Sequence, residues 1–278
     1  MNIEQLESKF GAMGARLKVT QTTTARQVWR SRRWGNEPKD YTVDIRSDSR
    51  GPYFDISVPD EIDDSLEFMV MQAEPKIRHL LLSVRRSKPE PRLDRFLCGH
   101  DEREWFVAAV PGGASSVRQA MDALQPEAVH ESLGRNQVSG RKRHSRKNRA
   151  FRRQGEWFFL PRPDLSAKGA FIRQNEPIRR GGGKPHLIDE VFRSGGGTVR
   201  VSWMHPNGIT EAEYQALIAS SEKARRTLWQ LMRRNATVYA RGAVRHSDHK
   251  TIVLPCWHQV VMNTEDSTPT MHRVAFLD

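Results

Sequence analysis

The sequence predicts an α+β protein with a β-rich N-terminal domain, a basic connector and a smaller, mixed C-terminal domain. Alternating apolar and polar residues, interrupted by turn residues, fill much of the N-terminal part and predict paired strands. Helix-capping patterns follow, and then nineteen residues that include lysine and arginine but no acid. We expect a β-rich domain over 1–113, a helical and basic connector over 114–153, and a mixed α+β domain over 154–278.

The composition limits the class of protein. The chain has 278 residues and a net charge of +12, a length that suits one large domain or two ordinary ones. Two cysteines, Cys98 and Cys256, cannot build a disulfide framework. The charged N-terminal sequence differs from a signal peptide, and no apolar run approaches the roughly 20 residues that cross a bilayer. We expect a cytoplasmic protein that does not enter membranes.

Three pairs of short alternating runs predict β-hairpins in the N-terminal domain. The pairs are residues 41–45 with 53–58, 66–72 with 79–84, and 95–98 with 105–110. Turn-forming residues join the members of each pair, as in the sequence SDSRG between the first two runs.

Helices are predicted where a capping residue precedes apolar residues at helical spacing. A short helix covers residues 2–10. Ser116 opens a second helix, and Pro126 restarts it at a position that proline tolerates. The clearest helix is predicted over 210–235, with a capping box at its start and apolar residues recurring along it.

The C-terminal part mixes strands with that helix. Residues 162–186 are rich in Gly, Pro and Arg, which predicts mostly loop. Short apolar runs predict strands on both sides of the helix. These runs are 156–160, 198–203, 238–244, 251–254, 258–262 and 273–277.

The positive charge is concentrated in residues 135–153, which hold nine Lys or Arg, whereas the other 259 residues carry only +3. Few residues here are apolar, so we expect an arm or linker that stays outside the core. Such charges neutralise phosphates and release counterions, which favours a nucleic-acid contact, to RNA or to DNA. A solvated linker and docking onto an acidic protein remain alternatives. The candidate binding residues are Arg141, Lys142, Arg143, Arg146, Lys147, Arg149, Arg152 and Arg153.

Aromatic residues next to arginines offer a weaker indication of nucleic-acid contact. Trp29 and Trp34 alternate with Arg30, Arg32 and Arg33, and aromatic rings can stack on bases. We treat these arginines as additional candidates for the same contact.

The densest group of catalytic residue types is His246, Asp248, His249 and Lys250, with His258 on the following strand. Imidazoles can act as general acid or base near neutral pH, and a lysine can stabilise a phosphoryl transition state. This group therefore suggests a phosphodiesterase or nuclease. The alternative is an ordinary polar turn, since turns favour such residues.

Other patterns are weaker, and we expect no metal ion and no other cofactor. Two Cys-x-His pairs, at residues 98–100 and 256–258, lack the usual spacing of a zinc site. Residues 181–184, GGGK, lack the full phosphate-loop pattern. His186, Asp189 and Glu190 follow on a predicted helical turn, where a role as metal ligands is the alternative and surface residues are the favoured interpretation.

Three stretches resemble those of an uncharacterised bacterial protein family. They are FLCGHDEREWF at 96–106, RQGEWFF at 153–159 and VRHSDHKT at 244–251. The resemblance implies a bacterial origin but no function, so no site residue is assigned from it.

The sequence thus predicts a nucleic-acid-binding protein that acts through its central basic arm. One alternative is a histidine-dependent phosphodiesterase or nuclease that uses residues 246–250. The other is a non-catalytic subunit whose basic arm binds a protein partner.

Overall fold

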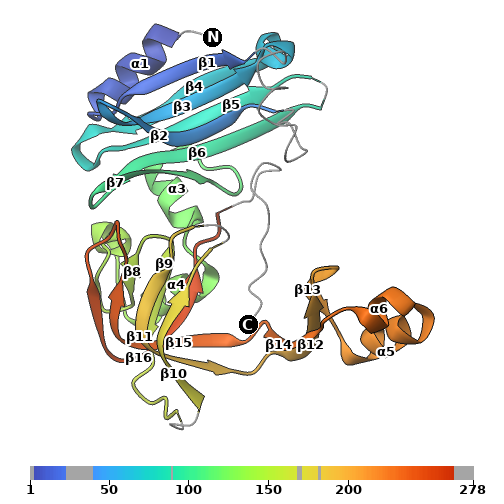
Figure 1. Ribbon diagram of the computed structural model, residues 1–278. Coiled ribbons are helices and arrows are strands. Elements are labelled where there is room, and N and C mark those ends of the chain that lie inside the picture. The colour runs from blue at the N-terminus through green and yellow to red at the C-terminus, as the bar shows by residue number, and fades with distance from the viewer. Residues whose placement is uncertain (1–2, 23–39, 89, 168–170, 181–182, 266–278) are drawn as a thin grey trace. The chain divides into compact units, whose positions relative to one another are not determined.

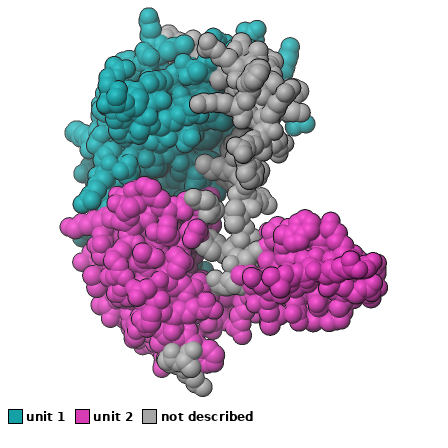
Figure 2. Space-filling view, in the orientation of Figure 1, with its two compact units in different colours: residues 1–134, 139–145, 263–272 teal, residues 135–138, 146–262, 273–278 magenta. Residues whose placement is uncertain are grey.

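The computed structural model describes residues 3–22, 40–88, 90–167, 171–180 and 183–265, and it confirms the α+β fold class (Figure 1). The chain forms two compact units (Figure 2). Unit 1 comprises residues 1–134, 139–145 and 263–272, and unit 2 comprises residues 135–138, 146–262 and 273–278. Within the described ranges, no helix is both long and apolar enough to cross a bilayer.

Unit 1 contains two sheets, and all three predicted hairpins are confirmed in them. One is a four-stranded antiparallel meander, in the order β4-β5-β6-β7. The other has the order β1-β3-β2, with β1 parallel to β3. The strands are β1 (Leu17–Thr22), β2 (Thr42–Asp48), β3 (Gly51–Pro59), β4 (Leu66–Glu74), β5 (His79–Arg86), β6 (Arg92–Asp101) and β7 (Glu104–Ala109). Short 3₁₀ turns at η1 (Asp60–Ser65) and η2 (Pro75–Ile77) precede β4 and β5.

Strand β5 of the four-stranded sheet in unit 1 is buried on both faces, because its alternate residues pack into two apolar layers. Leu80 belongs to one core cluster with Phe10 of helix α1 (Ile3–Ala12). Leu81 belongs to a second cluster with Val117. Val117 begins helix α3 (Val117–Ala123), whose cap Ser116 accepts a hydrogen bond from the Gln119 backbone N–H, as predicted. Helix α4 (Glu127–Arg135) follows Pro126, so the predicted helix restart is also confirmed.

Unit 2 is built on a six-stranded antiparallel sheet in the order β10-β11-β15-β16-β9-β8. Its strands are β8 (Arg152–Gln154), β9 (Trp157–Pro161), β10 (Ile172–Ile178), β11 (His186–Ser194), β15 (Thr237–Arg245) and β16 (Ile252–Met262). Ile188, Val244 and Leu254, one from each of three adjacent strands, meet in its core. Strand β10 lies inside the range predicted as loop, so that prediction is wrong there: Pro177 and Gly-rich flanks did not prevent pairing at the sheet edge.

Strands β11 and β15 continue into a second, three-stranded sheet of unit 2. Ser194 pairs with Thr237 and Gly197 pairs with Arg234, so the two pairings share one antiparallel register. This sheet, in the order β13-β12-β14, carries two helices. The elements are β12 (Gly197–Ser202), β13 (His205–Ile209), α5 (Glu211–Ser220), α6 (Glu222–Arg226) and β14 (Gln230–Arg234).

The long helix predicted over 210–235 is wrong beyond its first part. Its capping box is present, since Thr210 and Glu213 satisfy each other's backbone N–H groups. The first helix ends at Ser220, Ser221 caps α6, and the last residues form β14 against β12. The apolar residues that suggested one helical face include Leu228, which is largely exposed, so no core holds them in a single helix.

The basic stretch is ordered and divides between the units. Residues 139–145, with the 3₁₀ turn η3 (Gly140–His144), belong to unit 1, and residues 146–153 belong to unit 2. The expectation that the stretch avoids the core is wrong for its few apolar residues. Phe151 is buried with its ring 5.1 Å from that of Phe158. The predicted connector helices α3 and α4 lie in unit 1, apart from the last residue of α4.

Candidate functional site

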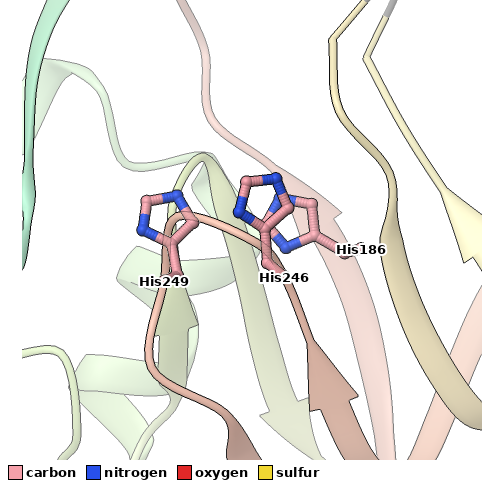
Figure 3. A group of neighbouring side chains, drawn as sticks. All are labelled: His186, His246 and His249. Carbon is pink, nitrogen blue, oxygen red and sulfur yellow. The ribbon is translucent and has the colours of Figure 1, made fainter.

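Three histidines converge at one end of the six-stranded sheet (Figure 3). His186 begins β11, and His246 directly follows β15. Because Leu187 pairs with Arg245, the next pair outward along these strands is His186 with His246. His249 lies in the loop before β16, and the three rings stack, with His246 between the others at centroid distances of 4.1 and 4.7 Å. One ring nitrogen from each histidine lies within 4.8 Å of the other two.

Gln154 holds both sides of this site together. Its Nε2 donates hydrogen bonds to the carbonyl oxygens of Val244 (3.2 Å) and Lys250 (2.8 Å), which flank the loop that carries His246 and His249. Its Oε1 lies 2.9 Å from His186 Nδ1. The two carbonyl acceptors fix the orientation of the amide, so Oε1 must accept and His186 Nδ1 must donate. In the neutral ring of His186, Nε2 therefore carries the lone pair.

Glu156 supplies a carboxylate beside the histidines. Its Oε2 lies 3.7 Å from His186 Nε2, and His186 itself is 1% exposed. Burial opposes ionisation of Glu156, but the interaction with His186 and the nearby charge of His249 outweigh it and hold the pKa of the carboxyl below its usual value. The site thus combines three imidazoles with one ionised acid.

Gly155 makes room for the rings. Gln154 pairs with Trp157, so Gly155 and Glu156 form the two-residue turn of the β8–β9 hairpin. Gly155 has φ +57°, and a Cβ there would lie 2.9 Å from His249 Nε2 and 3.4 Å from His186 Cε1. Only glycine combines this backbone conformation with the space that the two rings occupy.

Asp248, one of the predicted catalytic residues, supports the loop. Its carboxylate accepts two hydrogen bonds from Lys184 Nζ, at 2.7 and 2.9 Å, and this pair holds its pKa below the usual value. Its backbone N–H donates to His246 Nδ1 at 3.2 Å. Burial first, and then the neighbouring His186 and His249, lower the pKa of His246. Lys250 contributes its carbonyl to Gln154, while the residue as a whole is exposed.

His258, the other histidine among the predicted catalytic residues, is not one of the three described histidines whose ring nitrogens lie within 4.8 Å of one another. It pairs with Ala240 of β15, and a register shift lies between this pair and the pair of Gly242 with Leu254. Its Nδ1 lies 2.8 Å from the Cys256 carbonyl oxygen.

The site also includes residues that the sequence analysis missed or placed elsewhere. His186 was expected on a surface helical turn, but it is buried at the start of a strand. Gln154 and Glu156 were not candidates, although both lie in the stretch 153–159, which now meets 244–251 at the site.

The acids that follow His186 are occupied by arginines of β15. Asp189 pairs with Arg245 and accepts the backbone N–H of Ala243, whereas Glu190 pairs with Arg241. These contacts hold the pKa of both carboxyls below the usual value.

The candidate nucleic-acid residues fall into two groups. Arg141, Lys142 and Arg143 belong to unit 1, where Arg143 lies 3.6 Å from Asp122. The others belong to unit 2 and run directly into β8, which ends at Gln154. They are Arg146, Lys147, Arg149, Arg152 and Arg153. The predicted contacts around 26–34 lie outside the described residues.

The two Cys-x-His pairs belong to different units. Cys98 is part of the unit 1 core, where burial raises the pKa of its thiol well above the usual value, as expected for an inert cysteine.

Three imidazoles and a carboxylate in one group form the kind of arrangement that activates water or binds a transition metal. His186 is buried at its base, and His246 and His249 are half-buried, so the site is reached from solvent through the two loop histidines. The sequence matches no known protein family, and no curated protein or solved structure shows significant similarity to the chain.

Proposed function

We propose that this protein binds nucleic acid and hydrolyses its phosphodiester bonds at the histidine site. One observation carries the proposal: the basic stretch of unit 2 continues into the β8–β9 hairpin, and this hairpin contributes two residues to the histidine site. Residues 146–151 lead into β8, which contains Arg152, Arg153 and Gln154, and both Gln154 and Glu156 lie against His186. A backbone held by these cations therefore passes close to the imidazoles.

The charges suit a polyanionic substrate. Lys147 and Arg149 are exposed, and Arg146, Arg152 and Arg153 are half-buried along the same stretch. Lys184, whose side chain is 65% exposed, lies on the other side of the histidine loop through its contact with Asp248. Cations along this path neutralise phosphates without reading the base sequence.

The histidine site supplies the groups that hydrolysis requires. Water must be activated beside a phosphate whose charge is stabilised, and imidazole and carboxylate groups meet both needs. Gln154 keeps the His186 ring in one orientation, so the chemistry starts from a pre-positioned group.

Binding is tested with the full chain and labelled single- and double-stranded RNA and DNA at low and high salt. We expect the double substitution Lys147→Ser/Arg149→Ser to weaken binding and to reduce the salt slope by about 2, roughly 1 per phosphate contact. The matched control, Arg50→Ser/Lys76→Ser, removes the same charge from exposed positions of unit 1. Equal effects of the two double substitutions would contradict a binding role for this stretch.

Hydrolysis is tested on the same labelled substrates with His249→Ala, which changes a loop residue and so spares the core. We expect cleavage to be lost while binding stays within about twofold of the parent protein. Cleavage that survives this substitution would rule out the histidine site as the active centre.

A further inference from the structure

We infer that His186, His246 and His249 bind one divalent transition-metal ion of the zinc class. The inference deepens the proposed hydrolysis, because it names the ion that this site uses. Metal binding is nevertheless measured without nucleic acid, so the two proposals fail separately.

The spacing of the three nitrogens is close to that of a ligand set. Zn–N bonds of about 2.0–2.1 Å in a tetrahedral site place ligand nitrogens about 3.3 Å apart. The three nitrogens lie within 4.8 Å of one another, so the two loop rings must shift by about 1–2 Å and rotate out of their stack with His186 to complete the set. His186 is anchored in the sheet, whereas His246 and His249 lie in a half-buried loop that can make this adjustment.

The hydrogen bonds of His186 favour a metal ligand. Histidine ligands commonly donate their second ring N–H to a neighbouring oxygen, which fixes the tautomer and directs the lone pair at the ion. Gln154 accepts that hydrogen bond from Nδ1 and leaves Nε2 directed toward the site. Gln154 also donates hydrogen bonds to the two ends of the loop that carries His246 and His249, so one buried side chain supports all three histidines.

A cation also satisfies groups that otherwise face each other. The His186 Nε2 atom and the Glu156 carboxylate lie 3.7 Å apart, beyond hydrogen-bond length. A proton can bridge only one pair of groups, such as His186 and Glu156. A metal ion satisfies three imidazole nitrogens at once and also attracts the carboxylate.

The ligand types select the metal. Imidazole ligands suit zinc, cobalt, nickel and copper, whereas magnesium and calcium prefer oxygen. Three protein ligands leave a position for water, as in catalytic rather than structural zinc sites. Glu156 is then placed to hydrogen-bond that water, and the ion supplies Lewis acidity and a lowered pKa of the water. Asp248 is excluded from this role by its pair with Lys184.

Coordination by His246 has a specific structural consequence. His246 Nδ1 accepts the Asp248 backbone N–H. If Nδ1 binds the metal, its lone pair is used; if Nε2 binds it, Nδ1 carries the proton of the neutral ring. In both cases the hydrogen bond from Asp248 is lost, so the Asp248 amide reports metal binding by this ring.

The test uses the full chain, stripped with a chelator and titrated with Co²⁺ or Zn²⁺. We expect one ion per chain, a visible Co²⁺ spectrum of a nitrogen-rich tetrahedral or five-coordinate site, and a shift of the Asp248 amide NMR signal. His249→Ala should abolish binding of one ion per chain, and His205→Ala, which changes another half-buried histidine of unit 2, should leave it unchanged. Circular dichroism and the melting temperature establish that each variant is folded.

Two outcomes would overturn the metal site: a folded parent protein that binds no stoichiometric ion, or binding that His249→Ala leaves intact. Metal binding without cleavage would retain the site and reject the proposed hydrolysis. Cleavage that persists without bound metal would retain the proposed hydrolysis and reject a role for the ion in it.

Discussion

His186 and His258 are both buried strand residues of the six-stranded sheet in unit 2, but only His186 belongs to the histidine site. His186 is 1% exposed and His258 is 2% exposed. His246, His249 and Glu156 lie around His186. His258 Nδ1 lies 2.8 Å from the Cys256 carbonyl oxygen, and His258 is not part of the histidine group found among the described residues. Burial alone therefore does not identify a functional histidine, whereas convergence of several groups does.

The largest expected effect comes from Gln154→Leu, which removes the side chain that connects His186 with the loop of His246 and His249. The substitution removes the hydrogen bonds that Gln154 makes to His186 Nδ1 and to two carbonyl oxygens. It should lower the free energy of unfolding by about 3 kcal/mol or more, since each buried polar group that loses its partner costs roughly 1–3 kcal/mol. Metal affinity should fall about 10–100-fold, as for other groups that support ligands. Chemical unfolding and Co²⁺ titration measure the two effects. Unchanged metal affinity in a destabilised variant would reduce Gln154 to a structural residue.

Gly155→Ala should have the next largest effect, and Gly140→Ala is its matched control. Both glycines have φ +57°, so both substitutions pay the left-handed backbone penalty of about 1–2 kcal/mol. A Cβ at Gly140 meets nothing within 4 Å, whereas one at Gly155 meets His249 and His186. We expect only Gly155→Ala to weaken metal binding and cleavage. Equal behaviour of the two variants would show that the space beside the rings is not needed.

We expect His258 to make the stability of the protein depend on pH without affecting its function. Burial, and to a smaller extent the charge of Arg152, lowers the pKa of His258, although the Cys256 carbonyl opposes this. Because the pKa of His258 is lower in the folded state than in the unfolded state, the folded protein keeps its full stability above the unfolded pKa of about 6.5. Stability is lost as the pH falls from that value through the folded-state pKa.

His258→Asn should therefore reduce the fall in melting temperature between pH 7 and pH 5, when both proteins are measured with a chelator present. Metal binding and cleavage should be unchanged. Loss of metal binding or of cleavage in a folded His258→Asn protein would contradict the contrast between His258 and His186.

The smallest effect is expected for Lys184→Met, which breaks the ion pair with Asp248 on the rim of the histidine site. Because the lysine side chain is 65% exposed, solvent screens this pair, and its loss should cost about 0.5 kcal/mol or less. Metal affinity should change less than threefold, by analogy with other exposed pairs. A change as large as that of Gln154→Leu would show that Asp248 positions the loop more strongly than its exposure indicates.

The sequence by itself determined the features that depend on neighbouring residues. The hairpins of unit 1 follow from local alternation and turn residues, and the capping box at Thr210 and Glu213 forms as its spacing predicts. The proximity of His246 to His249 was also predictable, because one loop of a few residues carries both. The same local reasoning extended the helix over 210–235 too far, since strand pairing with β12 outweighed helical periodicity.

Only the tertiary structure decided what completes the site. His186 is sixty positions before His246, and it reaches that ring because β11 and β15 pair in a register set by the whole sheet. Gln154 and Glu156 arrive from the far edge of the sheet order through hydrogen bonds and a turn that no local pattern encodes. His258 is much closer to His246 in sequence, but it pairs with Ala240 of β15 instead. Strand pairing joins residues by register rather than by sequence distance, and for this reason the site could be recognised only in the folded chain.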